Sequence, residues 1–327
     1  MKTKRPIVAI CYDFDGTLAP GNMQEYGFFP GLSEENQKSF WNQSAELARR
    51  NGANQILAYM HLMLEKAKES KSQTDSPLKT TRKAIKEYGK SIPLFPGVDS
   101  WFKRVCSYGK TLGLQVEHYI VSSGLAEMIE GSSIYKEFTK VYACSFMYDH
   151  NDAAEWPAQV VDCTSKTQYL FRISKAAHDL SDTKKLNDPI KEEDRHVPFP
   201  RMIYIGDGST DVPCMTVVRN RGGHSIAVYD PRKRKAKKEA SELQTQGRVH
   251  YCFPADYQKG SPLETAVFAI LEKIAADYRL EHLPKRKRCP ESESTCEEVN
   301  AIYSDVGDTS SDSSTETNGK LNAPTSL

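Results

Sequence analysis

IVAICYDFDGT, residues 7–17, begins with six residues, Ile7–Tyr12, that form one uninterrupted apolar run. Such a run is typical of a strand that is buried on both faces of a parallel sheet. Asp13, Asp15 and Gly16 follow directly. Carboxylates are almost never buried without a cation or a proton, and open α/β sheets bind ligands at the carboxyl ends of their strands. The stretch therefore predicts either a ligand site at a sheet edge or, more simply, a strand that stops at an Asp-Gly turn.

The composition points to a globular protein with no strong global charge. The 327 residues include 44 basic and 43 acidic side chains, so the net charge is +1 and no overall field favours nucleic acid or a membrane surface as a partner. The eight cysteines include no C-x-x-C pair and several lie in apolar runs, as reduced thiols do. The first apolar run is too short for a signal peptide, and none reaches the roughly 18 to 20 residues of a membrane helix. We therefore expect a cytoplasmic protein with no nucleic-acid or membrane partner; its oligomeric state cannot be inferred.

The segment 21–93 carries the pattern of a helical insertion. Ser33 is a suitable N-cap with Glu34 and Glu35 in the first turn of a helix. A second helix is indicated over residues 53–68 by apolar residues spaced three and four apart, and a third from Ser76-Pro77 to about Gly89. We expect residues 21–93 to form a helical cap.

Strands alternate with helices through the rest of the globular part. Strands are predicted at 116–121, 141–149, 158–163, 202–205 and 225–230, and helices near 98–105, 125–129, 166–177, after 211 and from Ser261. This alternation is typical of an α/β fold with a Rossmann-like, doubly wound parallel sheet, here built from residues 1–20 and 94–283. Residues 284–327 are rich in Ser, Thr, Asp and Glu and are predicted to be a disordered tail. The basic runs 232–238 and 285–288 could form a nucleic-acid patch or a localisation signal, but they contain no interleaved aromatic residues, so they are interpreted as solvated charge.

Polar residues of complementary kinds follow several of these strands. Asp13 and Asp15, Ser122, and the pair Asp207 and Asp211 end three strands, and Lys166 opens a helix between them. The carboxyl ends of parallel strands share one edge, so these residues are expected to converge. Four carboxylates together would repel one another unless a divalent cation neutralises them, and Mg²⁺ prefers such oxygen ligands. Hydroxyl, ammonium and backbone N–H groups around that ion would form a phosphate cradle.

The set D-F-D-G-T (13–17), I-V-S-S-G (120–124), a lone Lys166 at a helix start and G-D-G-S-T-D (206–211) resembles the four motifs of haloacid-dehalogenase-superfamily phosphatases. The resemblance covers residues 7 to about 277. It implies a Rossmann-like core, and the helical segment after the first motif is similar to the type-one cap of phosphoserine-phosphatase-like members. Those members carry a glutamate soon after the first motif, where this chain has Asn22 with Glu25 displaced.

The resemblance also implies catalytic and metal-binding roles. Asp13 would be the nucleophile that carries the phosphoryl group as an aspartyl phosphate. Asp15 would protonate the leaving oxygen and then deprotonate the attacking water. Asp13, Asp207 and the backbone carbonyl of Asp15 would bind Mg²⁺.

The same resemblance implies that other residues bind the phosphate. Ser122 and Lys166 would hold the phosphoryl oxygens, with Ser123 and Gly124 in the same strand-end motif. Asp211 would steady Lys166 or a metal-bound water.

Simpler alternatives remain open from the residues alone. Asp211 could be only the N-cap of the next helix, and Lys166 only an exposed lysine, although a cation in a first turn opposes the helix dipole. Either Ser122 or Ser123 could be the phosphate ligand, with Ser122 favoured because it directly follows the apolar run. Thr17 is expected to steady the turn or Asp15.

These features predict a Mg²⁺-dependent phosphomonoester hydrolase that acts on a small phosphorylated metabolite. A phosphotransferase or mutase of the same fold is one alternative, and a non-catalytic binding protein that retains the fold is another. Asp15 argues against a dehalogenase, which has no leaving alkoxide to protonate. The aromatic residues Tyr26, Phe28 and Phe29, with Arg49 and Arg50, are expected either to line the substrate pocket or to lie exposed on the surface.

Overall fold

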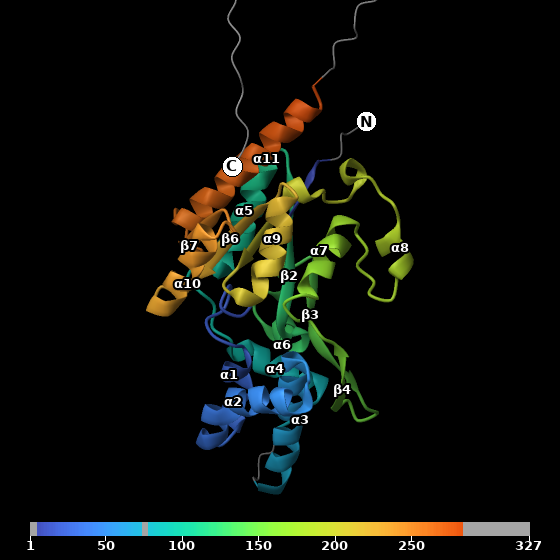
Figure 1. Cartoon of the computed structure of the whole chain (residues 1–327), viewed down its shortest axis with the longest axis vertical. Coiled ribbons are helices and arrows are strands. Elements are labelled where there is room, and N and C mark those ends of the chain that lie inside the picture. The colour runs from blue at the N-terminus through green and yellow to red at the C-terminus, as the bar shows by residue number, and fades with distance from the viewer. Residues whose placement is uncertain (1–4, 74–77, 284–327) are drawn as a thin grey trace, which may run out of the picture. The chain divides into compact units, whose positions relative to one another are not determined.

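A computed structural model of the chain describes residues 5–73 and 78–283, and the described residues up to His282 form one compact unit. Its centre is a seven-stranded sheet in the order β4-β3-β2-β1-β5-β6-β7 (Figure 1). The strands are β1 (Ile7–Tyr12), β2 (Gln115–Leu125), β3 (Lys140–Tyr148), β4 (Ala154–Gln159), β5 (Met202–Gly206), β6 (His224–Tyr229) and β7 (Tyr251–Pro254). The pairs are parallel except for β3 with β4, so the predicted parallel sheet gains one antiparallel edge strand.

Helices cover both faces of this sheet. Helix α5 packs on β2 and against α11, whereas α9 packs on β5 and β6 and against α7. Figure 1 shows α9 in front of the sheet and α5 behind it. The helices of this part are α5 (Val98–Thr111), α6 (Ala126–Gly131), α7 (Lys166–Ser174), α8 (Thr183–Asn187), α9 (Val212–Asn220), α10 (Arg234–Thr245) and α11 (Pro262–Glu281). The doubly wound α/β prediction is therefore confirmed.

The segment between β1 and α5 is helical, as predicted. It contains α1 (Gln24–Gly27), α2 (Glu34–Asn51), α3 (Gln55–Gln73) and α4 (Arg82–Tyr88). Ser33 caps α2, because its hydroxyl accepts a hydrogen bond from the Asn36 N–H, and Gly52 ends that helix in the left-handed conformation. The prediction that α4 starts at 76–77 is wrong: residues 78–80 are not helical, and Thr81 is the N-cap. Residues 76 and 77 themselves lie outside the described residues, as does the predicted tail 284–327.

Two glycines bring the end of the helical segment onto the core. A Cβ on Gly89 would lie 1.9 Å from the carbonyl oxygen of Met128, and one on Gly131 would lie 1.8 Å from that of Lys86. Only glycine permits such backbone contact. The end of α4 and the short helix after it are thereby packed directly on α6.

The core lies on both sides of β1, and all six residues of this strand are buried. The tyrosine that ends β1 is part of a polar chain in this core. Trp101 Nε1 donates to Tyr12 Oη (2.8 Å), which lies 3.1 Å from Nδ1 of His118, and His118 Nε2 lies 3.3 Å from Cys106 Sγ. These contacts satisfy polar groups that burial would otherwise leave without partners.

Helices α1, α8 and α10 and strand β7 escaped sequence analysis. Helix α10 has Ala236, Ala240 and Leu243 at helical spacing, but only Ala240 is fully buried, so its apolar face is narrow. No helix within residues 5–73 and 78–283 combines the length and apolar character needed to cross a membrane.

Candidate active site

The register of β1 and β5 places two predicted site residues side by side. Tyr12 pairs with Ile205, and the backbone N–H of Asp13 continues this ladder by donating to the Ile205 carbonyl (3.0 Å). Asp13 follows β1 and Asp207 follows β5, so both leave the sheet at the same edge. This edge is a switch point, because the chain runs from β1 to β2 on one side of β1 and later crosses from β4 to β5 on the other side.

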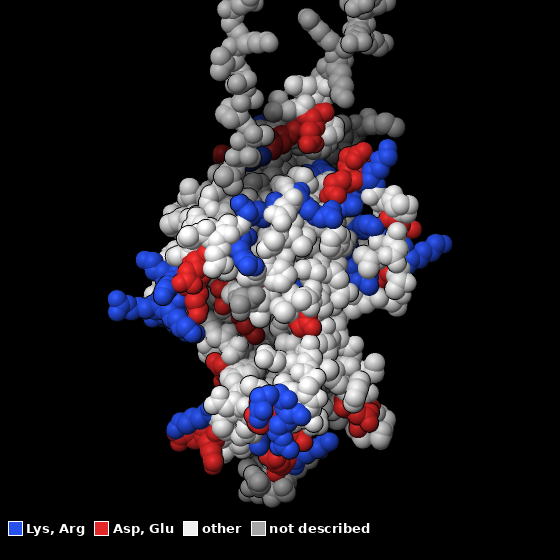
Figure 2. All heavy atoms as spheres, in the orientation of Figure 1, with Lys and Arg blue, Asp and Glu red and all other residues white. Residues whose placement is uncertain are grey.

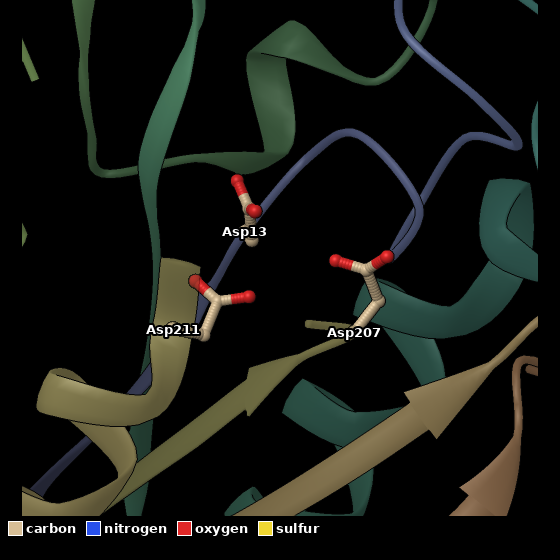
Figure 3. A group of neighbouring side chains, drawn as sticks. All are labelled: Asp13, Asp207 and Asp211. Atoms are coloured by element: carbon tan, nitrogen blue, oxygen red, sulfur yellow. The ribbon is translucent and has the colours of Figure 1, made fainter. Parts of the chain in front are cut away.

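Three carboxylates meet at this edge (Figure 3). One oxygen each from Asp13, Asp207 and Asp211 lies within 4.8 Å of the others. Figure 3 shows the Asp207 and Asp211 side chains pointing toward each other across the space beside Asp13. The acids that sequence analysis placed together thus come from loops nearly two hundred residues apart.

Lys166 reaches the same cluster from the first turn of α7. Its side chain is fully buried, and its Nζ lies 2.9 Å from Oδ2 of Asp13 and 2.7 Å from Oδ1 of Asp211. Burial alone would lower the pKa of Lys166, but the two carboxylates outweigh it and hold the pKa above its ordinary value. The alternative of an exposed lysine without a role is therefore wrong.

Asp211 is the most enclosed of the acids. Its Oδ1 also accepts a hydrogen bond from the hydroxyl of Tyr204 (2.7 Å), whereas its Oδ2 is buried without a hydrogen-bond partner among the described residues. Asp211 precedes α9, but its side chain makes no capping hydrogen bond there. The interpretation of Asp211 as a mere N-cap is therefore wrong.

The cluster has the properties of a divalent-cation site. Burial first, and then the neighbouring carboxylates, raise the pKa of Asp13 and the pKa of Asp207 above their usual range. Three ionised carboxylates at this distance therefore repel one another unless a positive charge in addition to Lys166 is present. The donors are all oxygens, which is the set that Mg²⁺ prefers, and Oδ2 of Asp211 has no other partner. The residues present fit a magnesium ion.

Asp15 lies on the turn after β1, facing the end of β2. Its Oδ1 accepts a hydrogen bond from the Met23 N–H (3.0 Å), and a Cβ on Gly124 would lie 3.2 Å from its Oδ2. Burial, then the charge of Asp13, raises the pKa of Asp15 well above its usual range. Asp15 therefore favours its protonated form beside Asp13.

The turn itself depends on Gly16. This residue has a φ of +73°, and a Cβ there would lie 2.0 Å from Oδ2 of Asp207. Glycine is thus required both for the conformation and for the close approach of Asp207.

Both candidate serines line the site. Ser122 is fully buried, and its Oγ accepts a hydrogen bond from the Gly124 N–H (3.1 Å). The Ser123 hydroxyl is buried without a partner among the described residues, while its carbonyl accepts from the hydroxyl of Tyr59 on α3 (2.8 Å). The choice between the two as phosphate ligand stays a prediction.

Thr17 lies at the far side of the turn. Its carbonyl accepts a hydrogen bond from the Tyr257 hydroxyl (2.8 Å), and its own hydroxyl is buried without a partner within the described residues. No contact between this hydroxyl and Asp15 is present there, so the backbone of Thr17 rather than its side chain anchors the turn.

A pocket of about 420 Å³ opens over these residues. Its floor contains Asp13, Asp15, Asp207 and the strand-end residues 122–124. The helical segment forms the opposite wall with Asn22, Gln24, Trp41, Ile56 and Tyr59, and Lys233 lines the pocket from the loop after β6.

Of the two alternatives for these aromatic residues and arginines, the pocket position is wrong. Phe28 and Phe29 are buried against Phe40, and Arg49 is exposed and pairs with Glu46. None of the five candidates lines the pocket. Trp41 and Tyr59, whose rings meet edge to face at 6.0 Å, occupy that position instead.

Comparison with known proteins agrees with this geometry. The family model of haloacid dehalogenase-like hydrolases matches residues 10–216. An uncharacterized protein of Borreliella burgdorferi is 30% identical over 300 residues, which cover 84% of this chain and 99% of that protein.

Solved structures with related folds are more distant. A HAD-family hydrolase from Salmonella enterica serovar Typhi has a TM-score of 0.49 at 15% identity, with 81% of this chain and 72% of that chain covered. A substrate-bound phosphoserine phosphatase has a TM-score of 0.45 at 15% identity, with 76% and 94% covered.

Proposed function

This chain belongs to the haloacid dehalogenase-like hydrolase family, and on that premise we propose that it is a Mg²⁺-dependent phosphomonoester hydrolase. The observation that supports this most strongly is the contact of Asp13 with buried Lys166 beside Asp207 and Asp211. The substrate would be a small phosphorylated metabolite, since the pocket holds about 420 Å³. The free thiols of the described cysteines suit the reducing cytoplasm that we propose as its location.

In the first step a carboxylate oxygen of Asp13 attacks phosphorus, and the bond from phosphorus to the leaving oxygen breaks. Asp13 is suited to this role because hydrogen bonds hold both of its oxygens. Oδ1 accepts from the Phe14 N–H (2.7 Å), and Oδ2 contacts Lys166. The carboxylate is thereby aimed out of the end of β1 and into the pocket.

Asp15 acts as the general acid in the first step and as the general base in the second. Its raised pKa keeps a proton available for the leaving oxygen. In the second step the resulting Asp15 carboxylate takes a proton from water as that water attacks the phosphoryl group on Asp13. Phosphate leaves, and both aspartates return to their starting states.

The remaining residues hold the phosphoryl group and the ion. Lys166, with the hydroxyl of Ser122 or Ser123, would bind the phosphoryl oxygens. Asp13, Asp207 and the backbone carbonyl of Asp15 would hold Mg²⁺, with Asp211 supporting Lys166. When bound, the ion offsets the charge that accumulates on the transferred group.

The test is phosphate release from a panel of amino-acid, sugar, nucleotide and aryl phosphates, with Mg²⁺ or with EDTA. Asp13→Asn should abolish release, and Asp15→Asn should lower it about 10²- to 10⁴-fold. Asp99→Asn, an exposed aspartate on α5, is the matched control and should retain activity. Release that persists in Asp13→Asn, or wild-type protein inactive on the whole panel, would contradict the proposal.

A further inference from the structure

The basic run 232–238 has six lysines and arginines among its seven residues. Figure 2 shows Lys and Arg side chains gathered over α10, which contains most of this run. One member of the run differs from the others. Lys233 lines the pocket that contains Asp13 and Asp207, and among the described residues that line this pocket it alone carries a cationic side chain.

The loop after β6 fixes where Lys233 lies. Asp230, which follows β6 directly, is nearly buried and accepts hydrogen bonds from Nε and Nη2 of Arg232 (2.8 Å each). The Lys233 N–H donates to the Asp230 carbonyl (3.0 Å). This turn therefore holds the backbone of Lys233 and leaves Arg232 neutralised.

The Lys233 ammonium, in contrast, takes part in none of the ion pairs or side-chain hydrogen bonds of the described residues, and its charge acts on Asp230 only through space. Lys235 and Lys238, farther along α10, lie 3.4 and 3.8 Å from glutamates one turn away. Lys233 is thus an exposed, unpaired cation at the mouth of an otherwise acidic pocket.

The two lysines of the site lie at different depths. Lys166 is buried and touches Asp13, so the transferred phosphoryl group belongs at its end of the pocket. Lys233 is exposed. A group that reaches Lys233 must therefore belong to the leaving group, whose carbon skeleton would lie against Trp41, Ile56 and Tyr59.

We propose that Lys233 is a specificity-determining residue that binds a second anionic group, a carboxylate or phosphate, on the leaving group of the substrate. This inference rests on the proposed phosphatase function. Lys233 distinguishes leaving groups by their charge, because a carboxylate or phosphate forms an ion pair with its ammonium and a neutral group forms none.

The test compares two substrates that differ by one charge, phenyl phosphate and 4-carboxyphenyl phosphate. The quantity measured is the ratio of their kcat/KM values, in which any general loss of activity cancels. The ratio is kcat/KM for 4-carboxyphenyl phosphate divided by kcat/KM for phenyl phosphate. We expect Lys233→Gln to lower this ratio about fivefold. Lys233→Arg should preserve it, and so should Lys237→Gln, a matched change on an exposed lysine that does not line the pocket. A ratio that Lys233→Gln leaves unchanged overturns the inference.

A binding measurement makes this test independent of turnover. Affinities of benzylphosphonate and 4-carboxybenzylphosphonate, measured by calorimetry with Mg²⁺, should show the same fivefold change in their ratio, reduced in 1 M NaCl by screening. If the wild-type protein binds the pair with this preference but hydrolyses no ester, the proposed function fails and the role of Lys233 stands. If it hydrolyses esters and Lys233→Gln leaves both ratios unchanged, only the role of Lys233 fails.

Discussion

The Nζ of Lys166 lies 2.7 Å from Oδ1 of Asp211, and neither side chain has any exposed surface. A buried pair of this kind is costly to break, because the remaining charge has no water to solvate it. The same ammonium neutralises Asp13, so one cation serves two carboxylates in the interior. Charge balance around Lys166 therefore determines how stable this buried cluster is.

The first prediction concerns this lysine. Lys166→Met leaves Asp13 and Asp211 buried without their cation, so we expect the free energy of unfolding to fall by about 3–5 kcal/mol. The double variant Lys166→Met/Asp211→Asn should recover part of that loss, because it removes one of the unpaired charges. Urea unfolding monitored by circular dichroism measures both values. Equal stabilities of wild type and Lys166→Met would contradict the expectation.

The second prediction concerns Gly16. A Cβ at this position would lie 2.0 Å from Oδ2 of Asp207, whereas one at Gly113, also left-handed with a φ of +80°, would meet nothing within 4 Å. Gly16→Ala and Gly113→Ala should both lose about 1–2 kcal/mol of stability from backbone strain. Only Gly16→Ala should also weaken Mg²⁺ binding, which calorimetric titration measures. Unchanged Mg²⁺ affinity in Gly16→Ala would show that Asp207 tolerates displacement.

The third prediction concerns the repulsion among the acids. Burial and the neighbouring carboxylates disfavour the charge of Asp207 when no cation is present. In EDTA we therefore expect Asp207→Asn to be more stable than wild type by about 1 kcal/mol. Mg²⁺ at 100 times its dissociation constant should stabilise wild type by about 2.7 kcal/mol, and the variant much less. Thermal unfolding with and without Mg²⁺ tests both signs, and a destabilised variant in EDTA would refute the idea.

The fourth prediction concerns pH and is independent of the acidic site. Burial lowers the pKa of His118 from 6.5 to about 3, so the folded state keeps this histidine neutral while the unfolded chain takes up a proton below pH 6.5. Stability is thus present above pH 6.5 and is lost as the pH falls toward 3. Between pH 7 and pH 5 this group alone should cost about 2 kcal/mol.

The comparison that isolates this effect is between wild type and His118→Gln. Other histidines titrate equally in both proteins, so the difference between their losses of unfolding free energy from pH 7 to pH 5 belongs to His118. Urea denaturation at the two pH values supplies that difference. Parallel losses in the two proteins would exclude His118 as the source.

Most of the sheet could be predicted because its buried strands are continuous apolar runs that end in polar residues. The run Ile7–Tyr12 and the residues Asp13 and Asp207 show this plainly, and the parallel topology then brings their ends together. Helix α10 could not be predicted, since its narrow apolar face lies among exposed polar and charged residues. The antiparallel β4 could not be distinguished from a parallel strand by its apolar pattern.

The residues that line the pocket wall could not be predicted from the sequence for a different reason. Periodicity shows that α2 has an apolar face, but it does not show which aromatic residue packs in the core and which faces the cavity. Phe40 is fully buried, while its neighbour Trp41 lines the pocket. Only the arrangement of α2 beside α3 decides between them.

The glycine contacts at Gly89 and Gly131 determine which wall of the pocket can yield when substrate enters or phosphate departs. Because the backbones of α4 and α6 touch directly at these glycines, the end of α4 cannot slide along the core and must move together with it. Within the described residues, the wall that carries Trp41 and Tyr59 has no such glycine contact with the core, and it is joined to Ser123 by the hydrogen bond from the Tyr59 hydroxyl to the Ser123 carbonyl. Any movement of α3 away from the sheet would therefore break the hydrogen bond that joins Tyr59 to the end of β2.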